Sequence, residues 1–267
     1  MINIKSLSDE DFEKLPLVVE GESKIVRQID NDLAVIKFKP TIYSFTSNRA
    51  GIVPGSDLLR LKTTSRIVPL LKAAGIKHAY REFSDKFILS DLIHSPPPIE
   101  VVVKSFHSGT SKHRYYGMSD YQVRSSHPLY AGRKIEPDGG YPCTLVRFDW
   151  RNPLKDKSGK NLADEVMSES LADWFIDVKA ATSTALRLQR ELSNILAKCD
   201  VVVYDLCLFI TQDGSTVFGE ISQDCGRFRH FDLGSLDKDV WRSGGSSEMV
   251  LEKWKLLDSL IQKAWGT

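Results

Sequence analysis

Residues 219–242 combine many side chains that could hold or transfer a charged group. The stretch carries ten ionisable residues of both signs, namely Glu220, Asp224, Arg227, Arg229, His230, Asp232, Asp237, Lys238, Asp239 and Arg242. We predict that a strand over 215–221 leads directly into them. Charged groups at the end of a buried strand are costly to desolvate unless they pair, bind a metal or bind a charged ligand. The segment therefore suits a polyanion that carries Mg²⁺, and the alternative is a surface loop with solvated ion pairs.

A second group of hydrogen-bond donors follows a β-branched run at residues 99–106. Hydroxyls, two histidines and three cations surround one glycine in Lys104, Ser105, His107, Ser108, Gly109, Thr110, Ser111, Lys112, His113 and Arg114. Such a loop suits phosphate or carboxylate groups, and a solvated basic loop is the alternative. We interpret the two histidines as positioning or surface residues rather than metal ligands.

A third segment is the short turn from Gly21 to Lys24. Glycine lets the backbone approach a phosphate, and a lysine just beyond it can neutralise the charge. The same pattern also occurs in an ordinary hairpin. Elsewhere, Cys225 lies among charges, so a thiol nucleophile is a further alternative, although no base is apparent beside it. The chain has no Walker A, G-x-G-x-x-G, G-x-S-x-G or H-E-x-x-H motif.

The predicted elements that position these segments are mostly strands in the first third of the chain and helices later. Strands are expected at 17–20, 25–28, 33–38, 41–47, 78–83, 86–92, 99–106, 143–150, 200–211 and 215–221, with a turn at 30–32. Helices are expected at 8–14, at 58–74 with Gly75 as a C-terminal cap, within 163–198, and at 247–265. This order favours an α+β fold. Three prolines at 96–98 predict a linker between two domains, residues 1–95 and 96–267.

Composition excludes several classes of protein. The 267 residues are 42% hydrophobic and 27% charged with a net charge of +1, so we expect no bulk attraction to nucleic acid or membrane. Four widely spaced cysteines argue against a structural zinc site or a disulfide framework. No signal pattern and no run of about 18 apolar residues is present. We therefore expect a cytoplasmic protein.

In their order and spacing, the three segments resemble the SAICAR synthetase family, the phosphoribosylaminoimidazole-succinocarboxamide synthases of purine biosynthesis. The family motifs G-K-x-K and E-x-V-V-R-N-x-x-x-G-S correspond to residues 21–24 and 100–110. The motifs D-E-x-S-P-D-x-x-R and L-D-K-D-x-[FW]-R correspond to residues 219–227 and 236–242. The resemblance spans roughly Glu20 to the C-terminal helix, and the last motif is the most specific.

The resemblance implies a two-lobed, kinase-like or ATP-grasp-like fold, with a β-rich N-terminal lobe that binds ATP and a larger α+β substrate lobe. ATP would lie near Gly21, Ser23, Lys24, Lys62, Ser95 and Pro97. The carboxylate substrate would be held by Lys104, His107, Ser108, Gly109, Thr110, Arg114, Ser222, Asp224 and Arg227. The candidate catalytic residues are Lys104, Asp224 and Arg227, and Mg²⁺ would bind Glu220 and Asp205.

The implied reaction activates a carboxylate with ATP as an acyl phosphate, which an amine such as aspartate attacks to give an amide, ADP and phosphate. The expected partners are small molecules, with a homo-oligomer left open. The sequence also departs from the family pattern at four places. Glu22 replaces a lysine, Lys104 replaces an arginine and Gly219 replaces an aspartate. Cys207 or Leu208 stands near the position at which the family has a metal-binding glutamate. Either Mg²⁺ is held differently, through Asp205 and Glu220, or the ATP chemistry has changed or been lost.

The leading hypothesis is an ATP-dependent, amide-forming ligase of the SAICAR synthetase type. Its substrate would be a carboxylate related to that of the family, in a secondary-metabolic or nucleoside pathway. A second hypothesis is a non-catalytic paralogue that binds a nucleotide or phosphoribosyl ligand. A kinase-like phosphotransferase is disfavoured because H-R-D and D-F-G motifs are absent. The first two hypotheses require that cations near 104–114 and 227 converge on one anionic ligand.

Overall fold

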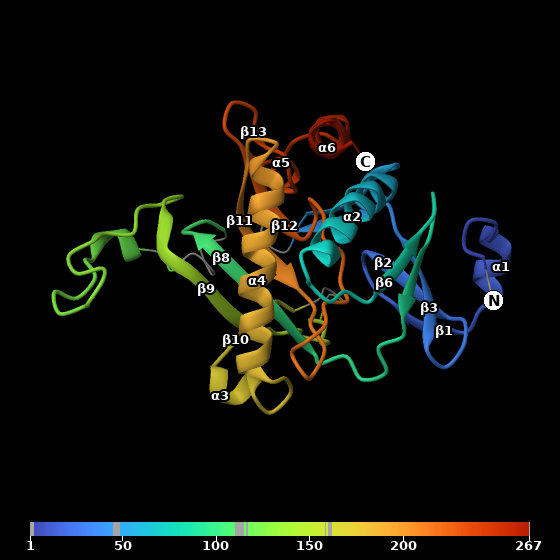
Figure 1. The fold of residues 1–267 in the computed structure, drawn as a ribbon, viewed down its shortest axis with the longest axis horizontal. Coiled ribbons are helices and arrows are strands. Elements are labelled where there is room, and N and C mark those ends of the chain that lie inside the picture. Colours follow the sequence, from blue (N-terminus) through green and yellow to red (C-terminus); the bar gives the residue numbers. More distant parts are fainter. Residues whose placement is uncertain are drawn as a thin grey trace.

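Two antiparallel sheets form the framework of the chain, one built from residues before the predicted linker and one from residues after it. The computed structural model describes residues 3–44, 49–109, 115, 117–157, 159 and 162–266. Figure 1 shows helix α2 (Ser56–Ala73) between the two sheets. The mixture of separate sheets and helices confirms the predicted α+β class. The division at residues 95 and 96 stays a prediction.

The first sheet has the strand order β1-β2-β3-β7-β6. Its strands are β1 (Leu17–Glu20), β2 (Lys24–Gln28), β3 (Leu33–Phe38), β6 (Tyr80–Phe83) and β7 (Ile88–Asp91). The predicted turn between β2 and β3 is present, and Oδ1 of Asp30 accepts hydrogen bonds from the amides of Asp32 and Leu33, each at 2.9 Å. Helix α1 (Asp9–Lys14) is the helix expected near 8–14, and the Ser8 side chain caps its N-terminus.

Helix α2 is the element shared by both halves of the chain, since it packs on α4 (Val178–Ala197) and α6 (Ser247–Trp265). It ends as predicted, because Gly75 has a φ of +83° and its amide bonds to the carbonyl of Lys72 at 3.0 Å. A positive φ favours glycine at this position. The strands β4 (Thr41–Ser44) and β5 (Arg49–Ile52) form a separate two-stranded ribbon.

The second sheet has the order β10-β9-β8-β11-β12-β13. Its strands are β8 (Ile99–Phe106), β9 (Gly140–Trp150), β10 (Glu165–Met167), β11 (Val201–Leu208), β12 (Gly226–His230) and β13 (Gly234–Ser235). Helix α4 lies across one face of this sheet (Figure 1). The remaining short helices are η1 (Met118–Asp120), α3 (Glu169–Ala172) and α5 (Asp239–Arg242).

The two faces of the second sheet differ in chemistry because successive strand residues point to opposite sides. One face places Val103, Leu206 and Phe228 in the buried core together with residues of α4. The neighbouring residues on the same three strands, Lys104, Asp205 and Arg227, belong to the opposite face. The central strands therefore separate a hydrophobic core from a charged surface.

The predicted strand over 215–221 is wrong, since this segment forms only isolated bridges at Val217. The amide of Val217 bonds to the carbonyl of Lys77 at 3.1 Å, and its carbonyl accepts the amide of Ala79 at 2.8 Å. Its backbone therefore joins the first half of the chain to the second, and Val217 also forms an antiparallel bridge with Ile210. The strand of this region is β12, which lies inside the charged stretch itself.

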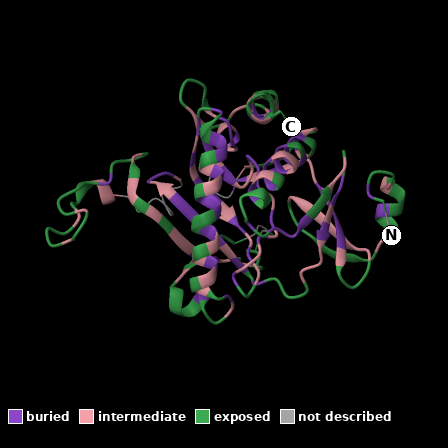
Figure 2. Cartoon of the chain, viewed as in Figure 1, coloured by how far each residue is buried: buried purple, intermediate pink, exposed green. Residues whose placement is uncertain are grey.

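Three further strands were not predicted, namely β5, β10 and β13, and β10 lies within the segment 163–198 that was expected to be helical. Most remaining differences are at element ends. The strand expected over 41–47 is described only to Ser44, because residues 45–48 lie outside the described ranges. The segment 117–139 is mostly exposed and projects away from the second sheet (Figures 1 and 2). Helix α6 has the predicted bounds. No helix within the described ranges is both long and apolar enough to cross a membrane.

Candidate functional site

The centre of the candidate site is a buried carboxylate between two cations, each supplied by a different strand. Strand register places Asp205 of β11 opposite Lys104 of β8 on one side and Arg227 of β12 on the other. Oδ2 of Asp205 lies 3.0 Å from Nζ of Lys104 and 2.6 Å from Nη1 of Arg227. Burial alone raises the pKa of the Asp205 carboxyl, but Arg227 and Lys104 together hold it below its ordinary value.

The loop after β8 passes directly over these two cations. Nζ of Lys104 donates to the carbonyl of Ser108 at 2.7 Å. Gly109 has a φ of +124°, and a Cβ at this position would lie 3.5 Å from Nζ of Lys104 and 3.7 Å from Nη1 of Arg227. Glycine thus keeps open the space beside both cations, where a negatively charged group could bind. The structure thus brings residues 104, 109 and 227 together, and their convergence on an anionic ligand stays a prediction.

Behind Arg227 lies a network of ion pairs that fixes its side chain. Nε of Arg227 is 3.3 Å from Oδ2 of Asp239, which also pairs with Arg229 and Arg242. Asp237 is fully buried, pairs with Arg229 and accepts the amide of Phe228 at 2.7 Å. Despite its burial, the surrounding arginines lower the pKa of Asp239 to about 2. Many charges of residues 219–242 therefore neutralise one another in ion pairs. The alternative interpretation predicted ion pairs in a solvated surface loop, whereas these pairs are largely buried.

Glu220, the first predicted metal ligand, is held by an arginine from the other half of the chain. Nε and Nη2 of Arg60 lie 3.0 Å from Oε2 and 2.9 Å from Oε1 of Glu220. Arg60 is fully buried in α2, and its Nη1 donates to the carbonyl of Lys39 at 3.1 Å. Its guanidinium also lies 4.8 Å from the ring centroid of Phe38. The two-pronged geometry is that of a strong, charge-assisted pair.

Lys24 lies close to this pair, at the start of β2. Its Nζ is 5.5 Å from the ring centroid of Phe209, and Cζ of Arg151 is 4.7 Å from the same ring. Within the described part of the chain, the structure forms no hydrogen bond or ion pair to Nζ of Lys24. Burial lowers the pKa of Lys24 to about 8, opposed by the negative charge of Glu220. An anion placed here would meet a cation from each half of the chain.

The predicted catalytic Asp224 lies in the turn that precedes β12. Its amide donates to Oγ of Ser222 at 3.1 Å, and its Oδ1 is 3.1 Å from Nζ of Lys238. Burial by itself raises the pKa of Asp224, but Lys238 and Arg60 lower it below the ordinary value. Burial also raises the pKa of the Cys225 thiol far above its ordinary value. A protonated thiol is a poor nucleophile, which argues against the thiol alternative.

The remaining predicted residues are distributed around these clusters. Gly21 closes the β1–β2 turn by donating its amide to the carbonyl of Lys24 at 2.9 Å, and the Ser23 carbonyl accepts from Arg60 at 3.4 Å. Lys62 is exposed on α2, and Ser95 and Pro97 lie in the linker. His107 is buried, with its Nδ1 at 2.9 Å from the hydroxyl of Tyr141. Thr110 and Arg114 lie outside the described residues.

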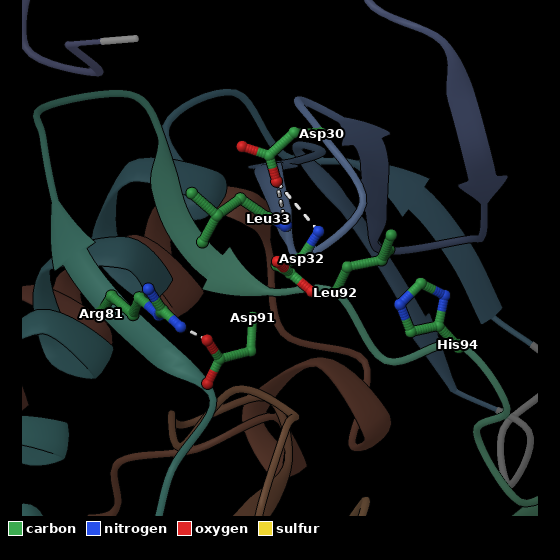
Figure 3. A pocket seen from close by; sticks show the side chains of 7 residues that line it. All are labelled: Asp30, Asp32, Leu33, Arg81, Asp91, Leu92 and His94. Carbon is green, nitrogen blue, oxygen red and sulfur yellow. Dashed lines mark hydrogen bonds and ion pairs between the residues drawn. The ribbon is translucent and has the colours of Figure 1, made fainter. Parts of the chain in front are cut away.

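A separate hollow of ≈ 420 Å³ opens beside the first sheet (Figure 3). Its lining residues are Asp30, Asp32, Leu33, Arg81, Asp91, Leu92 and His94. Arg81 pairs with Asp91, and the Asp30 side chain is bonded within its own turn, as the dashed lines in Figure 3 mark. None of these residues belongs to the predicted site.

The described residues do not form a cluster of side chains suited to a divalent metal ion. No group of three or more His, Cys, Asp or Glu side chains is arranged there to hold an ion. The two predicted ligands, Glu220 and Asp205, each contact internal cations instead. The metal assignment therefore stays a prediction, and the residues around it do not fit a metal as they stand.

Sequence reasoning missed three residues that shape the site: Arg60, Arg151 and Phe209. A signal existed for Arg60, since it sits among apolar and small residues on the buried side of α2. A charge at such a position indicates a buried partner. The identity of that partner could not be read from the sequence, because Glu220 is 160 residues away.

Comparison with known proteins gives one consistent result, although no family model matches the chain. The chain is 28% identical over 300 residues to bifunctional cordycepin biosynthesis cluster protein 3 of Cordyceps militaris, covering 94% of this chain but only 33% of that protein. It is 26% identical over 237 residues to the phosphoribosylaminoimidazole-succinocarboxamide synthase of Methanopyrus kandleri, covering 86% of this chain and 88% of that enzyme.

Solved structures of SAICAR synthetases share this fold. A SAICAR synthetase in complex with ADP matches 93% of this chain and 97% of its own with a TM-score of 0.71 and 23% identity. The synthase from Ehrlichia chaffeensis matches 93% of this chain and 98% of its own, with a TM-score of 0.75 and 20% identity. These findings confirm the predicted resemblance: curated relatives and structural neighbours are SAICAR synthetases, consistent with a divergent member of that family.

Proposed function

We propose that this protein, which resembles the SAICAR synthetases, is an ATP-dependent, amide-forming ligase. ATP phosphorylates a substrate carboxylate, an amine such as aspartate attacks the acyl phosphate, and phosphate leaves as the amide bond forms. The products are an amide, ADP and phosphate. We infer a carboxylate from a nucleoside or nucleotide pathway as the substrate.

The observation that carries this proposal is the pair of cations beside Gly109. Lys104 and Arg227 both contact Asp205, and the glycine leaves space next to their charged ends. Two cations fixed by a buried carboxylate are pre-organised, so they need not reorient when negative charge develops on the substrate. We assign Lys104, Gly109 and Arg227 to the anionic end of the carboxylate substrate, and Asp224 to the incoming amine.

Lys24 is the residue we assign to the ATP phosphates. It faces Phe209 and Arg151 across the contact between the two sheets, and no acceptor within the described ranges satisfies its ammonium. A phosphate would supply that acceptor and restore the charge that burial disfavours. Catalysis would then rest on positioning the two substrates and on electrostatic stabilisation by fixed cations.

Turnover with a panel of carboxylates and amines tests the proposal directly. The expected result is ADP release that depends on both the carboxylate and the amine. This ADP release should be lost in Lys104→Ala. Calorimetry with ATP at millimolar concentration provides the accompanying binding measurement. No heat on ATP addition, together with no ADP release for any carboxylate–amine pair, would rule out the ligase.

The second candidate function is a non-catalytic paralogue that binds a nucleotide or phosphoribosyl ligand. The observation that favours it is the ion-paired state of Glu220 and Asp205, the two predicted metal ligands. This candidate predicts heat on adding a nucleotide or a phosphorylated sugar, without ADP release under any condition. The same two measurements therefore separate the two functions.

A further inference from the structure

Both carboxylate oxygens of Glu220 and the neighbouring carbonyl of Gly219 already contact groups of the protein. Arg60 contacts both carboxylate oxygens of Glu220, at 3.0 and 2.9 Å. The carbonyl of the neighbouring Gly219 lies 3.0 Å from Nε2 of His78. The amide of Tyr80 donates to Nδ1 of His78 at 3.1 Å, so Nε2 carries the ring proton and donates it to that carbonyl. Mg²⁺ requires near-octahedral oxygen ligands at about 2.0–2.1 Å, which these engaged groups do not offer.

Position 219 is also tightly packed against a side chain that would have to shift before a second ligand could stand there. A Cβ on Gly219 would lie 3.0 Å from Cδ2 of Phe209. A carboxylate there would therefore require the Phe209 ring to move, and that ring carries Lys24 and Arg151 on its faces. The packing that brings these two cations together is the packing that excludes a second acidic ligand beside Glu220.

Arg60 is too firmly held to swing away from Glu220 at little cost. Its guanidinium also donates to the carbonyls of Lys39 and Ser23, at 3.1 and 3.4 Å, and the side chain is fully buried. The nearest other carboxylates repeat the pattern, since Asp205 contacts Lys104 and Arg227 and Asp224 contacts Lys238. Positive charge near each carboxylate is thus supplied from within the chain.

We propose that Arg60 takes the place of a divalent cation on Glu220, so that the protein binds a phosphate-bearing ligand without a metal ion held by its own carboxylates. Arg60 neutralises Glu220, and Lys24 and Arg151 supply the charge that faces the phosphates. The claim that a phosphate-bearing ligand binds without a metal ion rests on the proposed function. The claim that Arg60 replaces a cation on Glu220 does not.

Titration of the unmodified protein with Mn²⁺, followed by the electron paramagnetic resonance signal of free Mn²⁺, tests the claim about Glu220. We expect no stoichiometric site at micromolar Mn²⁺. The matched variants are Arg60→Met, expected to raise the Mn²⁺ affinity about tenfold or more, and Arg60→Met/Glu220→Gln, expected to abolish that gain. A micromolar site in the unmodified protein that Glu220→Gln removes would overturn the proposal, and this arm needs no Arg60 variant to fold. An unchanged affinity in a folded Arg60→Met protein would also overturn it.

Calorimetric titration with ATP in EDTA and in excess Mg²⁺ tests the claim about the ligand. We expect dissociation constants that agree within about threefold. Binding only in the presence of Mg²⁺ would overturn the inference and leave the proposed ligase standing. Absence of binding under both conditions would instead count against the proposed function, while the Mn²⁺ titration still decides the role of Arg60.

Discussion

Asp205 and Arg227 face each other across β11 and β12, and Nη1 of Arg227 lies 2.6 Å from Oδ2 of Asp205. The same oxygen is 3.0 Å from Nζ of Lys104 on the third strand. One buried carboxylate therefore holds two cations at the charged face of the second sheet. The surrounding network adds the cations Arg229 and Arg242 and the carboxylates Asp237 and Asp239. Its cations still outnumber its carboxylates, which suits an anionic ligand.

Asp205→Asn should destabilise the protein strongly. The substitution keeps the size of the side chain but leaves Lys104 and Arg227 as partly or fully buried cations without their shared partner. Removal of one member of a buried pair costs about 3–5 kcal/mol. Urea unfolding measures the free energy change. Asp232→Asn, at an exposed position in the β12–β13 turn, is the matched control and should unfold like the unmodified protein. A loss below about 1 kcal/mol would indicate an exposed, solvent-screened pair instead.

Arg227→Ala should weaken the binding of an anionic substrate more than it weakens folding. The control is Arg229→Ala, two residues along β12, which removes pairs to Asp237 and Asp239 but leaves the Lys104–Asp205 contact. We expect that control to lower thermal stability with little change in ligand affinity. Calorimetry and thermal unfolding on both variants provide the comparison. Equal losses of affinity and stability in Arg227→Ala would assign Arg227 to a structural ion pair.

Gly109→Ala should impair ligand binding through both backbone strain and obstruction. A non-glycine residue at a φ of +124° is strained, at a cost of about 1–3 kcal/mol, and the added methyl would fill the space beside Lys104 and Arg227. Gly132→Ala is the matched control, since that residue has a φ of +71° with nothing within 4 Å of the added Cβ. Both variants should lose stability, but only Gly109→Ala should lose affinity. Equal affinities in the two variants would contradict the placement of the anion.

The pH dependence of stability should report the buried ammonium of Lys24. Its pKa falls from 10.5 to about 8 on folding, so between those values the unfolded chain binds more protons than the folded one. The free energy of unfolding should therefore gain a contribution as pH rises from about 8 toward 10.5, and this rise should be absent in Lys24→Met. Lys62→Met, at an exposed position on α2, should retain the rise. ATP affinity should fall over the same range, because the neutral amine no longer attracts phosphate.

Local patterns along the chain predicted most of the secondary structure. The β-branched runs at 17–20 and 99–106, the Ser8 cap and the helix that ends at Gly75 were all confirmed. Each of these depends on interactions within a few residues, which a single sequence displays. The strand over 215–221 failed because the backbone of Val217 bonds to residues 77–79, and that competing partner lies far away in the chain.

The sequence by itself determined which charges the protein must accommodate. It placed Lys104 in a strand, Gly109 in the loop after it and Arg227 in a charged stretch, and the glycine and the cations together predicted an anion site. Only the tertiary structure decided how the carboxylates are neutralised. Whether Glu220 binds a metal or a guanidinium depends on α2, which packs Arg60 against it. The two residues are 160 positions apart in the sequence, so residue types along the chain do not show that they meet. The physical reason is that a buried carboxylate requires a counter-charge within about 4–6 Å, and folding alone selects which cation arrives there.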